Sequence, residues 1–211
     1  MNVAIGDIHG KNCWEKLLSY EADNIYFNGD YFDCYEKIPT VTQIRNFRKI
    51  CDMARKDPRI HLCLGNHDFQ YLRGLDRSEH YSGFQAYGRF DIQEALEENI
   101  DILKIVYQSG DYLISHAGIS KTFLKSLCLE NPLEINQRFI ENRMSLAFCG
   151  YNRYGDDVTQ GPLWIRPASL SKDKLDGYKQ IVGHTKVLDI AISEDLVLVD
   201  CLDTVVKSYN F

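Results

Sequence analysis

Five short polar clusters carry the residues of this 211-residue chain that could bind a metal ion or transfer a proton. The first cluster, Gly6-Asp7-Ile8-His9-Gly10, follows the apolar run Asn2–Ile5 directly, and each of the others follows an apolar run of its own. Those others are Gly29-Asp30, Gly65-Asn66-His67-Asp68, Ser115-His116-Ala117-Gly118 and Gly183-His184-Thr185. Carboxylate, imidazole and amide groups without a thiolate suit Mn²⁺, iron or Zn²⁺. The clusters therefore predict a metal centre.

Each cluster has an ordinary structural interpretation when it is taken alone. Gly and Asp favour turns at strand ends, and a single histidine is more often hydrogen-bonded than metal-bound. The joint pattern favours chemistry, because four of the six histidines follow apolar runs in this way. Buried carboxylates and imidazoles that converge without a cation would be costly.

The apolar runs are short and continuous, which predicts buried β-strands. Helical patterns separate several of them, and Thr40 is expected to cap the second of these helices. The expected helices are Asn12–Tyr20, Val41–Lys56 and Leu133–Phe148, and two late hairpin-like strands are Val187–Ile192 and Leu196–Val199. This alternation predicts a mixed α/β fold with its functional loops beyond the carboxyl ends of the strands.

The five clusters, in this order, resemble the motifs of the calcineurin-like metallophosphoesterases and span residues 6–185. Within that superfamily, the opening motif and Gly183-His184-Thr185 resemble the phosphoprotein phosphatase branch. That branch includes serine/threonine phosphatases and symmetrical dinucleoside polyphosphate hydrolases. The resemblance implies one α/β domain over residues 1–211, with two mixed β-sheets packed face to face and helices on the outside. It also implies two divalent ions, with Mn²⁺ expected and iron or zinc as alternatives.

The resemblance implies a role for each matched residue. Six of them would bind the two ions: Asp7 and His9 the first, Asn66, His116 and His184 the second, and Asp30 both. His67 would protonate the leaving oxygen as a general acid, with Asp33 accepting its other N–H. The ions would supply a bridging hydroxide that attacks phosphorus.

The sequence departs from the family pattern at two points. Asp33 is followed by Cys34-Tyr35, where the family has Arg-Gly with an arginine that binds substrate phosphate. Asp68 stands where the phosphoprotein phosphatases usually have glutamate. Cys34 is interpreted as a small space-filling residue, with an oxidisable thiol near two cations as the alternative.

A second phosphate-binding arginine is expected at Arg166. The segment Gly161–Pro167 resembles the part of bacterial members that carries this residue, and a guanidinium group matches phosphate bidentately. The alternative is a surface arginine beside a buried tryptophan. Arg143 and Arg153 are further candidates without a motif, and residues 150–161 form either a substrate lid or a solvated connector.

Composition limits the remaining choices. The formal net charge of −6 argues against a nucleic-acid substrate, because proteins that bind polyanionic backbones carry a basic face. Seven cysteines without a CxxC pair predict reduced thiols in the cytoplasm, and none has the arginine six residues later that a cysteine-dependent phosphatase needs. The N-terminal run lacks the basic region of a signal peptide, and no apolar stretch approaches membrane-spanning length.

The expected activity is hydrolysis of a phosphate monoester on a phosphorylated protein, of the serine/threonine type, or on a small phosphate ester. A dinucleoside polyphosphate or nucleotide hydrolase is the first alternative, since it would use the same centre. A metal-bound scaffold without turnover is the alternative from another class. The sequence indicates no oligomeric state.

Overall fold

Two five-stranded sheets of mixed direction form the centre of the fold in the computed structural model, which describes residues 1–74, 83–146 and 157–211. In spatial order, the first sheet consists of β10 (Tyr209–Asn210), β1 (Asn2–Ile5), β2 (Asn24–Phe27), β3 (Ile60–Cys63) and β4 (Leu103–Lys104). The second consists of β5 (Val106–Ser109), β6 (Tyr112–Ser115), β7 (Lys179–Val182), β9 (Leu196–Leu198) and β8 (Ala191–Ile192).

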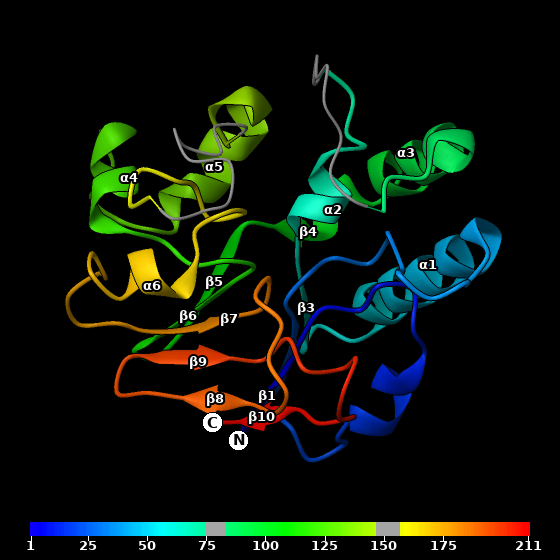
Figure 1. Cartoon of the computed structure of the whole chain (residues 1–211), viewed down its shortest axis with the longest axis horizontal. Helices are drawn as coiled ribbons and strands as arrows, with labels where there is room; N and C mark the ends of the chain where they lie inside the picture. Colours follow the sequence, from blue (N-terminus) through cyan, green and yellow to red (C-terminus); the bar gives the residue numbers. More distant parts are fainter. Residues whose placement is uncertain (75–82, 147–156) are drawn as a thin grey trace.

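Parallel pairing occupies the middle of both sheets. Strands β1 to β4 run parallel to one another, and so do β6, β7 and β9. The antiparallel strands β10, β5 and β8 lie at sheet edges. The backbones of Asn2 and Phe211 exchange hydrogen bonds of 2.7 and 3.0 Å, so the two ends of the chain lie side by side (Figure 1). The expected pair of mixed sheets is confirmed.

Alternate residues of the strands face the space between the sheets. This inner cluster is formed by Ala4, Tyr26 and Cys63 from the first sheet with Ile114, Ile181 and Val197 from the second. The neighbours of these residues along β1 and β2, such as Ile5 and Phe27, point to the other face and pack in the larger core beneath the helices. The period of two follows from the pleat of a β-strand.

The helices lie outside the sheets (Figure 1). On the side of the first sheet are α1 (Thr40–Lys56) and α3 (Arg89–Glu97), and on the side of the second are α4 (Lys121–Ser126), α5 (Glu134–Glu141) and α6 (Pro167–Leu170). Helix α1 buries Ile44, Phe47 and Ile50, one face of the predicted amphipathic pattern. The single turn α2 (Asn66–Phe69) begins three residues after β3 ends.

Two of the expected helices are shorter than predicted. In place of Asn12–Tyr20 there is a 3-10 turn at Cys13–Leu17, whose N-cap Asn12 makes no side-chain capping bond. So short a segment does not offset the cost of helix nucleation. In place of Leu133–Phe148, α5 ends at Glu141. The side-chain oxygen of the next residue, Asn142, accepts the N–H of Met144 at the start of a 3-10 turn, Arg143–Leu146. Residues 147 and 148 lie outside the described ranges.

Two further expectations about the elements are wrong. Thr40 does not cap α1: it is the first residue of the helix, after Pro39, and its hydroxyl donates to the side-chain oxygen of Gln85. The expected strand Val187–Ile192 is reduced to β8, because the N–H of Val187 bonds the carbonyl of Asp200 and that of Ile190 bonds its neighbour's carboxylate. Those donors are therefore not available to a strand ladder.

No helix within residues 1–74, 83–146 and 157–211 has the length and apolar character needed to cross a bilayer.

Candidate metal centre

The polar clusters meet where the central strands of both sheets end. Asp7 and Asp30 follow β1 and β2, and Asn66 opens α2 after β3. From the second sheet, His116 directly follows β6, and His184 lies two residues beyond β7. Of these five side chains, the first four are buried and His184 is half-buried. Residues that are far apart in the sequence thus share one buried site, because parallel strands bring their carboxyl ends to the same edge.

The backbone at these strand ends is unusually tight. A Cβ atom on Gly65 would lie 2.1 Å from Asp30 Oδ1, and one on Gly183 would lie 1.9 Å from Asp7 Oδ1. Only glycine allows this approach. Among the described residues, five other than glycine have a positive φ angle, and four of these lie at the site: His9, Asp30, Asp33 and His184. Such strain tends to gather at functional sites.

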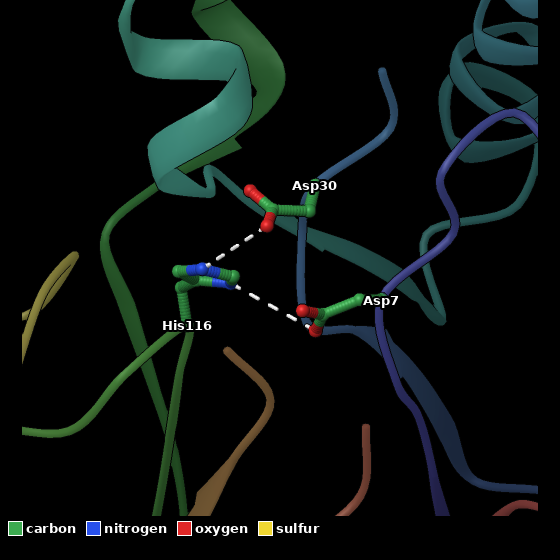
Figure 2. Close-up of side chains that lie close together, drawn as sticks. All are labelled: Asp7, Asp30 and His116. Carbon is green, nitrogen blue, oxygen red and sulfur yellow. Dashed lines mark ion pairs between the residues drawn. The ribbon is translucent and has the colours of Figure 1, made fainter. Parts of the chain in front are cut away.

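Two carboxylates and one imidazole lie close enough together to hold a metal ion: those of Asp7, Asp30 and His116 (Figure 2). Asp30 Oδ2 lies 3.5 Å from His116 Nε2, and Asp7 Oδ1 lies 3.9 Å from His116 Nδ1. One ligand atom from each of the three residues lies within 4.8 Å of the other two. Asp30 also faces the other side of the site, since its Oδ2 lies 3.8 Å from His9 Nε2.

Three imidazoles are oriented by backbone carbonyls. His9 Nδ1 contacts the carbonyl of Phe32 at 2.8 Å, and His116 Nδ1 contacts that of Asn28 at 2.9 Å. His184 is bound through its other nitrogen, Nε2, to the carbonyl of Trp164 at 3.1 Å. A carbonyl oxygen can only accept, so the bonded nitrogen carries the proton in each ring. The remaining nitrogen therefore presents a lone pair to the site.

The free ring nitrogens of His116 and His184 both face the side-chain oxygen of Asn66. His116 Nε2 and His184 Nδ1 lie 2.8 and 2.9 Å from the same oxygen, Asn66 Oδ1. Burial lowers the pKa of His9 and His116 and lowers that of His184 well below its usual range, which keeps the rings neutral. A bound cation would accept these lone pairs and so remove the repulsion between them. Metal-binding histidines usually donate their other ring N–H to a carbonyl or carboxylate, as these rings do. The residues fit a divalent ion.

His67 is held differently. Its Nδ1 donates to Asp33 Oδ2 at 2.9 Å, so a carboxylate rather than a carbonyl lies behind the ring. Burial alone would lower the pKa of His67, but the negative charge of Asp30 and then the bond to Asp33 raise it to about 8. The Asp33 carboxylate is fully buried and also accepts from Gln70, Tyr71 and Gln85. His67 is thus suited to hold a proton at neutral pH.

Negative charge is concentrated in the same place. Burial raises the pKa of Asp7 well above its usual value, and the charges of Asp200 and Asp30 raise it further. Burial also opposes ionisation of Asp30, but its interactions with the surrounding histidines, His116 first and His67 next, lower its pKa. Asp68 is committed elsewhere, since its two oxygens accept the N–H groups of Tyr31 and Gly65. Bound cations would relieve the repulsion among the carboxylates of Asp7, Asp30 and Asp200.

Arg166 lies beside the site. Its Nη1 donates to the carbonyl of His184 at 3.0 Å and to the hydroxyl of Thr185 at 3.1 Å. Its positive charge contributes to the low pKa of His184, after burial and His116. The guanidinium group is therefore next to the loop after β7 that carries His184.

The other sequence candidates lie less centrally or outside the described residues. Arg143 forms an ion pair with Glu97 at 2.6 Å, so its positive charge is balanced by that carboxylate. Cys34 is partly exposed in the loop after Asp33, and its N–H bonds the side chain of Gln43. Arg153 and most of the 150–161 stretch lie outside the described ranges. Its described part, residues 157–161, begins with Asp157, which accepts the N–H and hydroxyl of Thr159 in a local turn.

Two features of the site were not predicted from the sequence. Asp200, which is 7% exposed, lies two residues beyond the end of β9. The signal was present, since the run Leu196–Val199 ends on an aspartate just as Asn2–Ile5 ends on Gly6-Asp7, but no histidine marks it. The three donors around Asp33 gave no sequence signal.

The fold and the site resemble known proteins. A profile of the calcineurin-like phosphoesterase family matches residues 3–191. Searching the curated proteins yields no match. A point mutant of a cold-active protein tyrosine phosphatase has a similar structure, with a TM-score of 0.66, 19% identity, and coverage of 98% of this chain and 72% of that one. The cold-active protein-tyrosine phosphatase of a psychrophilic Shewanella species gives a TM-score of 0.63 at 19% identity, with the same coverage.

At such identity the two structures show a shared fold. The family profile shows membership of the family, because its match covers most of the chain and includes all five polar clusters. Metal-dependent hydrolysis of phosphoesters is the chemistry of this family, and the convergent ligand set described above agrees with it. The protein belongs to the calcineurin-like phosphoesterase family.

Proposed function

We propose that this protein hydrolyses phosphate monoesters on phosphorylated proteins, of the serine/threonine type, at a centre of two divalent ions. One observation carries the proposal. Three imidazoles are fixed by carbonyls so that they offer lone pairs, whereas His67 is fixed by a carboxylate so that it keeps a proton. Ligands and a proton donor are the two components that ester hydrolysis at a metal centre requires.

The proposed ligands divide between two ion positions. The first position takes Asp7 and His9, and Asp30 is shared because its Oδ2 faces both His9 and His116. The second position takes the residues whose donor atoms meet around the amide oxygen of Asn66: His116 and His184. Bound cations would neutralise the phosphoryl oxygens and lower the pKa of a water nucleophile. Mn²⁺ is the expected ion, with iron or zinc as alternatives.

His67 is proposed to donate its Nε2 proton to the leaving oxygen. Its Nδ1 is held by Asp33, which fixes the ring and stabilises the protonated form. Three further donors, from Gln70, Tyr71 and Gln85, hold Asp33 itself in place. The acid is thus oriented before substrate arrives, which reduces the entropy lost in the transition state.

Arg166 is proposed to bind the substrate phosphate. Its bonds to the carbonyl of His184 and the hydroxyl of Thr185 support this role, because His184 is a proposed ligand of the second ion. This contact has particular weight here, because Cys34 stands where the family has its other phosphate-binding arginine.

A second candidate substrate is phosphotyrosine. Tyr35 is 62% exposed, and its ring centroid lies 5.5 Å from that of His9 and 6.2 Å from that of His67. An exposed aromatic ring next to the proton donor favours an aromatic leaving group, since offset or edge-on ring pairs are stabilising. The structural relatives named above are called protein tyrosine phosphatases, which is consistent with this candidate.

The test is a substrate comparison with the Mn²⁺-loaded protein. Phosphoserine, phosphothreonine and phosphotyrosine peptides are compared with a diadenosine polyphosphate and bis-p-nitrophenyl phosphate, with His67→Asn as the control for contaminating activity. We expect kcat/KM on at least one phosphoserine or phosphothreonine peptide to exceed the other values. Preference for the diadenosine compound would replace the proposal with a dinucleotide hydrolase. Metal binding without turnover on any substrate would indicate a scaffold.

A further inference from the structure

Asp200 occupies a fixed place against the first cluster. A Cβ atom on Gly6 would lie 2.0 Å from the carbonyl oxygen of Val199 and 3.1 Å from the Cα of Asp200. The carbonyl of Asp200 also accepts the N–H of Val187 at 2.9 Å. The backbone of Asp200 is therefore held next to the residue that precedes Asp7, and Gly6 is glycine because nothing larger fits.

Asp200 is a largely buried residue, 7% exposed, whose carboxylate has no direct partner. No hydrogen bond or ion pair joins that carboxylate to a residue in 1–74, 83–146 or 157–211. The nearby lysines are engaged by a different residue, since Lys11 and Lys186 both donate to Asp203. A carboxylate on so largely buried a residue is more stable as an anion when a cation lies near it.

Asp200 lies beside the residues proposed for the first ion position. Because Gly6 directly precedes Asp7, the backbone contact between Gly6 and the segment Val199-Asp200 brings Asp200 next to the first ligand of that position. A raised pKa of Asp7, to which burial contributes most and the charge of Asp200 next, agrees with this proximity. The ends of β1, β2, β3, β6 and β7 each provide a proposed ligand, and Asp200 stands in the equivalent place after β9.

We propose that Asp200 is a further residue of the first ion position, where its carboxylate strengthens the binding of the cation held by Asp7, His9 and Asp30. The proposal rests on the metal centre of the proposed function but not on the identity of the substrate. Asp200 acts by adding negative charge on the side of Asp7, and the cation in turn offsets the repulsion between the two carboxylates.

The test compares wild type with Asp200→Asn, which keeps the shape of the side chain and removes its charge. Calorimetric titration of the metal-free proteins with Mn²⁺ measures the affinity at each position. We expect Asp200→Asn to weaken one of the two binding events by roughly 10–100-fold, the usual effect of losing a supporting group around a metal. Asp176→Asn is the control for net charge, because Asp176 is an exposed partner of Lys121, and it should bind Mn²⁺ as wild type does.

Thermal unfolding provides a second readout that a purely structural role would not produce. Without metal, Asp200→Asn should melt at the same or a higher temperature than wild type, because one of several repelling buried charges is gone. With Mn²⁺, its melting temperature should rise less than that of wild type.

Wild-type Mn²⁺ affinity at both positions in Asp200→Asn would overturn the inference, and so would an equal loss in Asp176→Asn. A lower melting temperature of metal-free Asp200→Asn with an unchanged response to Mn²⁺ would make Asp200 a structural residue. Absence of Mn²⁺ binding by wild type would instead remove the metal centre of the proposed function, which distinguishes the two failures.

Discussion

The four histidines of the candidate centre differ in the group that accepts the hydrogen bond of their ring N–H. His9, His116 and His184 each have a carbonyl that fixes one ring nitrogen as a donor, and His67 has the carboxylate of Asp33. In the proposed function this difference separates lone-pair donors from the proton donor, although all four residues are histidines that follow strands. Three predictions belong to this scale.

Replacing His67 tests the assignment of the acid. His67→Asn should retain its metal and lose roughly 10²–10⁴ in kcat on esters with poor leaving groups, because a positioned acid contributes that much. With p-nitrophenyl phosphate the loss should be smaller, since that leaving group needs little protonation. Elemental analysis and the two kcat values check the prediction, and equal losses on both substrates would remove His67 from this role.

Replacing the shared carboxylate tests the arrangement of the ions. Asp30→Asn should lower occupancy at both positions because Asp30 faces His9 and His116, whereas His184→Ala should mainly empty one. The measurement is metal content per chain after purification in Mn²⁺. Two ions per chain and normal turnover in Asp30→Asn would contradict a shared role.

Phosphate binding is expected to depend heavily on Arg166. Charge-assisted hydrogen bonds contribute about 1.5–3 kcal/mol, so Arg166→Ala should weaken inhibition by inorganic phosphate roughly ten- to hundredfold. Because Arg166 also bonds His184 and Thr185, Arg166→Lys is needed to separate lost charge from a disturbed loop. Cys34→Arg should strengthen phosphate inhibition, with Cys34→Ser as the control for the thiol. An unchanged inhibition constant in Arg166→Ala would show that another group holds the phosphate.

At the scale of the elements, the strands position the site through glycines at their ends. Gly65 and Gly183 allow the loop of one strand to lie against a carboxylate from another, with no room for a methyl group. The loops after β2 and β7 also hold Asp30 and His184 at positive φ, which the surrounding packing must stabilise.

Gly183→Ala should therefore damage metal binding more than folding. The new Cβ would meet Asp7 Oδ1 at 1.9 Å, so the carboxylate must move away from the first ion position. Gly177→Ala is the matched control: its Cβ meets nothing within 4 Å, and its cost, about 1–2 kcal/mol, comes from its positive φ alone. Mn²⁺ affinity and melting temperature of both variants are the measurements. Equal Mn²⁺ affinity in the two variants would contradict the role given to the strand-end contact.

At the scale of the whole molecule, the candidate ligands come from both sheets. Asp7, Asp30 and Asn66 follow strands of the first sheet, while His116 and His184 follow strands of the second. An ion bound by both sets joins the two sheets at the edge where their parallel strands end. The inner apolar cluster joins them along the rest of their faces.

Removing the metal should accordingly lower the stability of the whole fold. An ion present at 100 times its dissociation constant stabilises the native state by about 2.7 kcal/mol, which corresponds to roughly 5–10 °C in melting temperature for a chain of this size. Thermal unfolding with EDTA and after addition of Mn²⁺ measures the shift. Identical melting curves would argue against an ion that joins the sheets.

The sequence by itself predicted the strands of the centre and most of the candidate site. β1 has the predicted bounds, Asn2–Ile5, because a continuous apolar run is typical of a strand with both faces buried. The nine candidate site residues could be named because type, spacing and order were visible without any contact. Elements whose form depends on local hydrogen bonds, such as the 3-10 turn at Cys13–Leu17 and the short β8, were predicted less well.

Only the tertiary structure decided which groups form hydrogen bonds with the histidines of the site. The carbonyls of Phe32, Asn28 and Trp164 are backbone atoms that any residue would provide, so no residue type in the sequence marks them. Asp200 lies beside the site because Gly6 lets the backbone after β9 approach the end of β1, a contact between segments almost two hundred residues apart. The sequence records side-chain chemistry, whereas the proximity of distant strands follows from how both sheets pack.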